Sequence, residues 1–306
     1  IMSENGNFKE PGKAGRLFSG FFSHFLQLLL VNISFLVLNI PSMLVSLAYC
    51  LLLLPGINPV FVPENFGKFM TSAGFIGQGS SEDAVNQLYF MMILFLAMFL
   101  LGSMLVCIGP FQAGFSTIYR NIIRGYGVDL LSDFKEGLKE NWKRSLISML
   151  ISWVFTFISL FSIGFYAGIG GSFGKVVTFF FVFLFLMFTI INSMVNYMTV
   201  TVDLPLKKMY KNSLIFFFIR LIPCIGLMIL LAFVYFLIPL LLIMFITSLA
   251  YPVAVGLYFF LGFIWWQYLI SFFTNELINK YMAVEEDEND EKTNMEYTDT
   301  EGGSEK

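Results

Sequence analysis

Five stretches of this chain contain no Asp, Glu, Lys or Arg, and each is long enough to cross a lipid bilayer. They cover residues 17–63, 84–119, 145–174, 176–202 and 221–275. A bilayer's hydrocarbon core is about 30 Å thick, so a helix that rises about 1.5 Å per residue needs roughly 20 apolar residues to cross it. Only 13% of the 306 residues are charged and 57% are apolar, which excludes an ordinary soluble domain. The sequence predicts an all-α, polytopic membrane bundle.

These stretches accommodate about six transmembrane helices, because the last stretch is long enough for two passes separated at Tyr251-Pro252. The expected helices cover residues 20–54, 88–109, 145–167, 176–199, 221–248 and 253–275. The first is long, and we expect a kink at Pro41. The alternative is a seventh span, with residues 20–39 and 42–55 each crossing, although the second piece is short for a full crossing.

The distribution of Lys and Arg predicts the orientation of the bundle. Sixteen of the 18 lie in segments that six spans place on one side, and only Lys68 and Lys175 fall on the other. Because Lys and Arg accumulate in cytoplasmic loops, we expect both termini in the cytoplasm. The predicted parts are a cytoplasmic segment 1–19, a membrane domain 20–281, an external loop 55–87 and an acidic, disordered cytoplasmic tail 282–306. The external loop is either a connector against the membrane or a contact for an outside partner.

The cytoplasmic segment 128–143 has the pattern of an amphipathic helix. Leu130, Phe134, Leu138 and Trp142 recur at intervals of four, with charged residues on the other faces. One interpretation is a helix lying at the inner membrane interface and anchored by Trp142. The other is an apolar stripe that docks on a partner.

Two polar faces are predicted within the spans. His24, Asn32 and Asn39 are spaced by eight and seven residues, and Asn192 and Asn196 form a second face. Such groups face the bundle interior, because an unpaired amide in hydrocarbon is costly. They either line a substrate path or form hydrogen bonds between helices that fix the packing.

The inventory of reactive groups argues against an enzyme. His24 is the only histidine, which excludes metal triads and Ser/His/Asp constellations, and no P-loop is present. Cys50, Cys107 and Cys224 are scattered in apolar runs without metal-ligand spacing. We therefore expect no catalytic residue, cofactor or metal. Ten of the 21 acidic residues lie in the tail and the rest of the chain is only mildly basic, so we expect membrane lipid and no nucleic acid as a partner.

Two stretches resemble the YesL family, the DUF624 integral membrane proteins of Gram-positive bacteria. One is the apolar run of residues 29–41, with its Asn and closing Pro. The closer match consists of Gly109-Pro110-Phe-Gln-Ala-Gly114, Tyr119-Arg120-Asn121, Arg124-Gly125, Asp133-Phe134-Lys135 and Asn141-Trp142-Lys143. The resemblance implies a multi-pass protein of the bacterial cell membrane with a part in sugar uptake, as an accessory subunit of an ATP-binding-cassette (ABC) importer.

Two functional hypotheses follow. The first is a non-enzymatic accessory protein that binds a carbohydrate ABC importer or a similar membrane complex. Its candidate docking residues are Leu130, Phe134, Leu138, Trp142, Gly109, Pro110, Arg120 and Asn121. The second is a solute or lipid transporter that uses the two polar faces of the spans.

Overall fold

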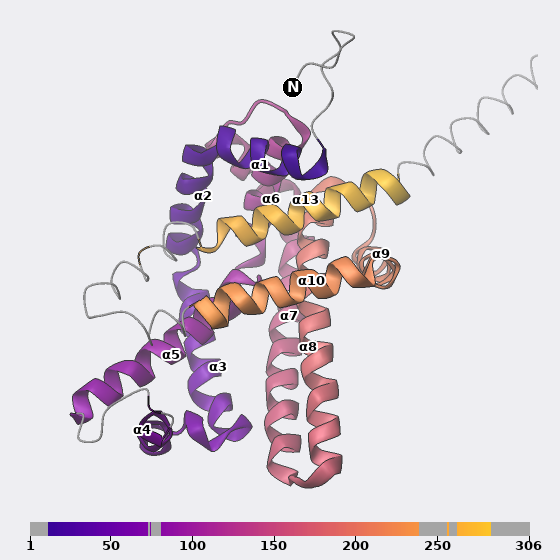
Figure 1. Cartoon of the computed structure of the whole chain (residues 1–306). Helices are drawn as coiled ribbons and strands as arrows, with labels where there is room; N and C mark the ends of the chain where they lie inside the picture. Colours follow the sequence, from indigo (N-terminus) through magenta and orange to yellow (C-terminus); the bar gives the residue numbers. More distant parts are fainter. Residues whose placement is uncertain (1–11, 73, 75–80, 239–255, 257–261, 283–306) are drawn as a thin grey trace, which may run out of the picture.

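The computed structural model describes residues 12–72, 74, 81–238, 256 and 262–282, and its described elements are all helices (Figure 1). In chain order they are α1 (Lys13–Ser23), α2 (Phe25–Leu38), α3 (Ile40–Ile57), the short 3-10 helix η1 (Pro59–Phe61), α4 (Pro63–Ser72), α5 (Glu82–Gly102), α6 (Gly109–Arg124), α7 (Leu130–Ile169), α8 (Gly171–Thr201), α9 (Leu206–Ile219), α10 (Leu221–Ala232), the π-helix η2 (Phe233–Leu237) and α13 (Ile264–Tyr281). The predicted all-α class is confirmed.

Four described helices are long and apolar enough to cross a membrane, and two bent helix pairs raise the number to as many as six. The four are α3, α5, α7 and α8; the pairs are α1 with α2, bent by 73°, and α9 with α10, bent by 97°. The chain is therefore a polytopic membrane protein. The candidate spans differ from the predicted ones in two ways. Helix α3 is a candidate span by itself rather than part of the span 20–54, and α13, which overlaps the predicted span 253–275, is not a candidate. Some predicted elements lie partly outside the described residues. These are the predicted spans 221–248 and 253–275, at residues 239–255 and 257–261, and almost all of the tail 282–306.

The predicted first helix, 20–54, is interrupted twice. It bends sharply at His24, between α1 and α2, and breaks again at Asn39, between α2 and α3. The second break lies two residues before the expected kink, because Pro41 occupies the first turn of α3, where its missing N–H costs nothing. Figure 1 shows α3 continuing from α2 in the same general direction.

The amphipathic segment 128–143 and the predicted span 145–167 form one continuous helix, α7, rather than two elements. No proline or helix-ending glycine separates them, so the helix continues through Lys143 and Arg144. At 40 residues it is about 60 Å long, roughly twice the thickness of the hydrocarbon core. The charged first half of α7 therefore extends beyond the apolar layer when the second half spans it.

The predicted span 88–109 also requires a correction. Helix α5 ends at Gly102, and residues 103–108 form an irregular segment before α6 begins at Gly109. We call residues 103–108 the linker. Pro110 explains why a new helix begins here. Proline is favoured in the first turn of a helix, but inside a helix it lacks the N–H for the hydrogen bond to the preceding turn.

The break between the predicted spans 145–167 and 176–199 is a glycine turn between α7 and α8. It is short, since α7 ends at Ile169 and α8 begins at Gly171. Gly170 and Gly171 have φ of 68° and 64°, values that glycine adopts without a steric cost. The resulting hairpin of α7 and α8 projects from one end of the molecule (Figure 1).

The buried core lies at the end of the α7–α8 hairpin that is far from the turn at Gly170. Residues 189–200 of α8 are all buried, enclosed by α6, α7, α9 and α13. Helix α3 runs beside α7 in the same direction: the Tyr49 hydroxyl donates to the Trp153 carbonyl (3.4 Å), and the backbones approach closely at Gly56 and Gly164.

The predicted orientation gives a labelling pattern. In a background with Cys50, Cys107 and Cys224 replaced by alanine, a membrane-impermeant thiol reagent should label Lys68→Cys, on exposed α4, in intact cells. Lys139→Cys, exposed on the first half of α7, should be labelled only after permeabilisation. The opposite pattern would reverse the orientation derived from Lys and Arg.

Candidate functional site

The linker is a stretch of irregular main chain buried among helices. Residues 103–107 are all buried, and their N–H groups partly turn back onto α5: both Leu105 and Val106 donate to the Leu100 carbonyl, at 3.1 and 3.0 Å. Away from water, each remaining unpaired carbonyl or N–H would cost a large part of a hydrogen bond's free energy. The linker therefore needs partners from outside its own chain segment.

Side chains of two long helices supply the donors to the linker's carbonyls. From α8, the Asn192 amide donates to the Met104 carbonyl (3.0 Å) and the Ser193 hydroxyl to that of Ser103 (3.3 Å). From α7, the Ser152 hydroxyl donates to the Leu105 carbonyl (2.7 Å), and the Trp153 ring N–H donates to the Cys107 carbonyl (3.2 Å).

The break between α2 and α3 supplies the acceptor. The Asn39 side-chain oxygen accepts the Ile108 N–H (2.8 Å), while its amide nitrogen donates to the Phe35 carbonyl (2.9 Å). One fully buried asparagine thus satisfies the start of α6 and the end of α2 together. Two helix interruptions stabilise each other through it.

Met104 is held in an unusual conformation within the linker. Its φ of 61° is the one left-handed value among the described non-glycine residues, and such strain costs on the order of 1–3 kcal/mol. Its sulfur lies 3.1 Å from the Gln112 amide nitrogen and 3.8 Å from that of Asn196. Contacts to its carbonyl and its sulfur together keep Met104 in place.

The two polar faces predicted within the spans therefore meet only in part. Asn39, Asn192 and Asn196 all lie at the linker. Asn32 is fully buried elsewhere, where its side-chain oxygen accepts the Ile264 N–H at the start of α13 (3.1 Å). His24 stays at the bend between α1 and α2, with Nδ1 3.1 Å from the Gly20 carbonyl oxygen. The buried amides bond to main chain, to sulfur and, at Asn192, to the Tyr210 hydroxyl, which favours the packing interpretation; a substrate path along these residues stays a prediction.

Helix α6 and the first half of α7 form an antiparallel hairpin whose backbones are nearly in contact. A Cβ at Gly109 would collide with the Ser145 carbonyl, one at Gly114 with Phe134, and one at Gly137 with Thr117. Small residues permit such close approach between helices.

The ends of this hairpin have strong local signals. α6 closes on Gly125, with φ of 72°, in a left-handed cap. Asp129 then caps α7 by accepting the N–H groups of Leu131 and Ser132, both at 3.2 Å. The sequence of this turn alone dictates where α6 ends and α7 begins.

The residues of the predicted docking stripe differ in their exposure, because the hairpin of α6 and α7 covers some of them. Phe134 turns toward α6, with its ring 5.0 Å from that of Phe115, and Leu130 and Leu138 are half-buried. Trp142 is exposed, and the Lys143 ammonium lies 5.6 Å from its ring centroid. Docking by this stripe stays a prediction, but a large part of its apolar surface already has a partner within the fold.

The other candidate docking residues also have contacts within the fold. Gly109 and Pro110 begin α6 against α7. Arg120 donates to the Val200 carbonyl (2.7 Å) in the last turn of α8 and to the Asn121 side-chain oxygen (3.2 Å). A guanidinium at the C-terminus of a helix also complements the helix dipole.

An apolar groove of about 350 Å³ runs between α2, α6 and α7. Its walls include Leu30 from α2, Phe115 from α6, and Leu131 and Phe134 from α7. Leu131 is 63% exposed and Leu30 is 53% exposed, so both side chains stand on the rim of the groove. Leu131 lies beside the predicted stripe but does not belong to it.

Sequence reasoning missed the stripe of hydroxyl residues on α7 that contains Ser152, a donor to the linker. Ser145, Ser148, Ser152, Thr156 and Ser159 recur at intervals of three or four and are all buried on one face of α7. That spacing is a usable signal, because a polar stripe along a membrane helix faces other helices. Of these residues, Ser152 donates to the linker, whereas Ser148 bonds the Tyr210 hydroxyl (3.0 Å). The linker itself has no comparable sequence signal, because its residues are mostly apolar.

Gly137→Ala tests the close approach of the hairpin. Alanine normally favours a helix interior over glycine by about 1 kcal/mol, but here its methyl group meets Thr117 and the Ala113 carbonyl. We expect a loss of about 1–3 kcal/mol and a lower midpoint of thermal unfolding in detergent. Gly127→Ala, with open space around it, is the matched control. An unchanged or raised midpoint for Gly137→Ala would contradict the packing.

Asn39→Leu tests the support of the linker. The change leaves the Ile108 N–H unpaired, which should cost about 1–3 kcal/mol and speed hydrogen–deuterium exchange in a peptide covering residues 103–112. In Asn141→Leu the lost bond is local, to the Gly137 carbonyl of the same helix, so exchange in that peptide should stay as in the wild type. Equal exchange in both variants would show that Asn39 does not hold the linker.

Comparison with known proteins identifies the region that contains this site. Residues 88–163 match the family described as "Protein of unknown function, DUF624". No curated protein and no solved structure matches the chain. The matched residues comprise most of α5, the linker, α6 and α7 as far as Ile163; the apolar run 29–41 that also suggested the resemblance lies outside them. This chain is a helical membrane protein with a DUF624 family domain at residues 88–163.

Proposed function

We propose that this protein is a non-enzymatic accessory membrane protein that binds another membrane protein through the groove between α2, α6 and α7. The permease subunits of a carbohydrate ABC importer are the expected partner. That identity rests on the family resemblance, whereas the docking mode rests on the geometry of the groove.

The observation that carries the proposal is the exposed apolar rim of this groove. Leu30 and Leu131 project from two different helices, with Phe134 half-buried between them. Two of the three helices that form the groove, α6 and α7, belong to the DUF624 domain. An apolar groove between helices is a common receptor for a partner helix that inserts one apolar face.

The surroundings of the groove define the kind of helix that would fit. On α7, Lys135, Glu136 and Lys139 are exposed just beyond Leu131. A partner segment there meets apolar side chains on one face and charged groups or water on the other. An amphipathic helix at the membrane surface has this character.

The transporter hypothesis has less support. Asn39 and Asn192, two of its candidate lining residues, are engaged with main-chain groups of the linker. A substrate that used these amides would have to displace those bonds and leave buried carbonyl and N–H groups unpaired.

Leu131→Glu tests the docking mode. Tagged protein should be purified from its native membrane in mild detergent, and the co-purifying chains quantified by mass spectrometry. We expect permease subunits with the wild type and at least tenfold fewer with Leu131→Glu, because burying a leucine contributes about 1.5–3 kcal/mol. Tyr126→Glu, an exposed position in the turn outside the groove, should retain the partner. Recovery of the wild type without any permease subunit would overturn the proposal, as would an equal loss in both variants.

A further inference from the structure

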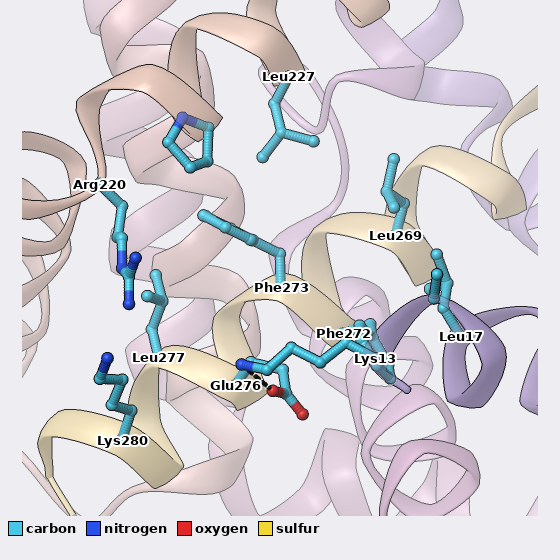
Figure 2. A pocket seen from close by; sticks show the side chains of 12 residues that line it. Lys13, Leu17, Arg220, Leu227, Leu269, Phe272, Phe273, Glu276, Leu277 and Lys280 are labelled. Carbon is cyan, nitrogen blue, oxygen red and sulfur yellow. Dashed lines mark ion pairs between the residues drawn. The ribbon is translucent and has the colours of Figure 1, made fainter. Parts of the chain in front are cut away.

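A second pocket, of about 320 Å³, lies between α1, α10 and α13, on helices that do not form the groove (Figure 2). Its floor is apolar and includes Leu17, Leu227 and Phe273. Lys13, Arg220 and Lys280 stand around it, one from each wall. Its size is at the lower end of the range of roughly 300–1,000 Å³ that is usual for ligand pockets.

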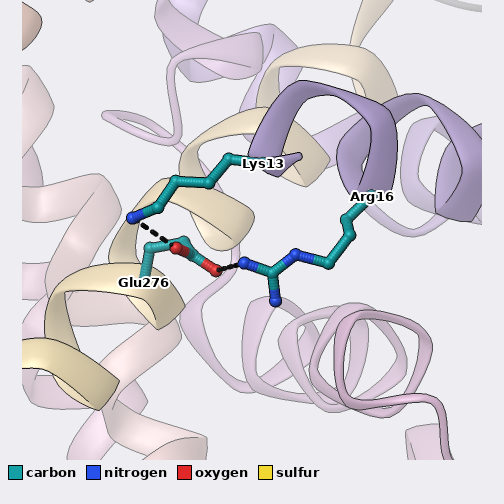
Figure 3. A network of polar contacts seen from close by, with 3 residues as sticks. All are labelled: Lys13, Arg16 and Glu276. Atoms are coloured by element: carbon teal, nitrogen blue, oxygen red, sulfur yellow. Dashed lines mark hydrogen bonds and ion pairs between the residues drawn. The ribbon is translucent and has the colours of Figure 1, made fainter. Parts of the chain in front are cut away.

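One carboxylate at this pocket is already neutralised. Glu276 on α13 forms ion pairs with Lys13 (2.7 Å) and Arg16 (3.0 Å) of α1, as Figure 3 shows. The Glu276 side chain is only 16% exposed, so this pairing fastens the N-terminal helix to α13. It leaves no negative charge on Glu276 for the other cations.

Arg220 and Lys280 have no such partner. Within the part of the chain that the structure describes, neither forms a salt bridge. Both instead lie near the Tyr281 ring, the Arg220 guanidinium carbon at 5.8 Å and the Lys280 ammonium at 5.3 Å from its centroid. Figure 2 shows their charged ends on the same side of the pocket. Two like charges held together, with no salt-bridge partner among the described residues, attract an anion.

The surface next to Arg220 is apolar and exposed. Phe218, Ile219 and Ile222 are all exposed, and Ile222 reaches 84%. In a membrane protein these side chains face lipid, so the cations stand where an apolar pocket meets the acyl-chain region. The Lys and Arg distribution predicts that this end of the molecule lies at the cytoplasmic leaflet, which is rich in anionic lipid.

We propose that this pocket binds one anionic phospholipid, with the phosphate between Arg220 and Lys280 and an acyl chain along the floor formed by Leu17, Leu227 and Phe273. The lipid supplies two features, a negative charge beside two cations that form no salt bridge among the described residues, and an apolar chain over an open apolar floor. A soluble anion would satisfy only the first.

Native mass spectrometry in detergent tests the site. Full-length protein is titrated with phosphatidylglycerol and with phosphatidylcholine of the same acyl chains. We expect preferential retention of phosphatidylglycerol at one site. Arg220→Gln/Lys280→Gln should weaken it about 30-fold, which is about 2 kcal/mol for two cations near a membrane surface. Lys135→Gln/Lys139→Gln removes the same charge from exposed positions on α7 and should bind as the wild type does.

Two further arms distinguish lipid binding from misfolding and from the binding of a soluble anion. Arg220→Lys/Lys280→Arg keeps both charges and should retain the lipid, so a loss there equal to that of the neutral variant would indicate misfolding and overturn the assignment. Inorganic phosphate at millimolar concentration should not displace the lipid, and its displacement would point to a soluble anion instead. Equal retention of the two lipids, or an equal loss in the α7 control, would also overturn the proposal.

Discussion

Where water is excluded, a main-chain N–H or carbonyl outside a helix needs a hydrogen-bond partner from elsewhere in the protein. In this protein many such groups lie together in the linker at residues 103–108. Asn39, Ser152, Trp153, Asn192 and Ser193 supply these partners from three separate parts of the chain. Each of these bonds also fixes a distance between helices. The relative positions of α2, α3, α7 and α8 therefore depend on one irregular segment that belongs to none of them.

The linker determines the position of the hairpin of α6 and α7. Because α6 starts where the linker ends, the Ile108 N–H bonded to Asn39 sets the point at which the hairpin leaves the core. The close contacts at Gly114 and Gly137 then occupy the facing sides of α6 and α7. The outer edge of the hairpin stays free of these contacts, and Leu131 and Trp142 are exposed there. The same packing that makes the hairpin rigid thus defines its free surface.

The sequence predicted the helices well wherever apolar content and length decide the outcome. It correctly predicted a break between residues 167 and 176, the polytopic class and the DUF624 resemblance around Gly109 and Arg120. It failed where tertiary contacts override local pattern. Residues 103–108 are apolar apart from Ser103 and contain no proline or glycine, so local pattern does not predict their irregularity, which hydrogen bonds from other helices support. The continuity of α7 was missed for a related reason, since a change from charged to apolar composition marks a membrane boundary and not a helix end.

Charge acts at two levels in this chain. Summed over segments, Lys and Arg predict which side faces the cytoplasm, and this holds whatever their neighbours are. Locally, the fold decides which cations are neutralised. Glu276 pairs with Lys13 and Arg16, whereas Arg220 and Lys280 lie near the Tyr281 ring instead. The pocket lined by Lys13, Arg220 and Lys280, which we call the basic pocket, is also connected to the apolar groove. Helix α1 leads directly into α2, and Asn32 of α2 accepts the Ile264 N–H at the start of α13. Helix α2 is therefore held by the elements of the basic pocket on one side and forms the wall of the groove on the other.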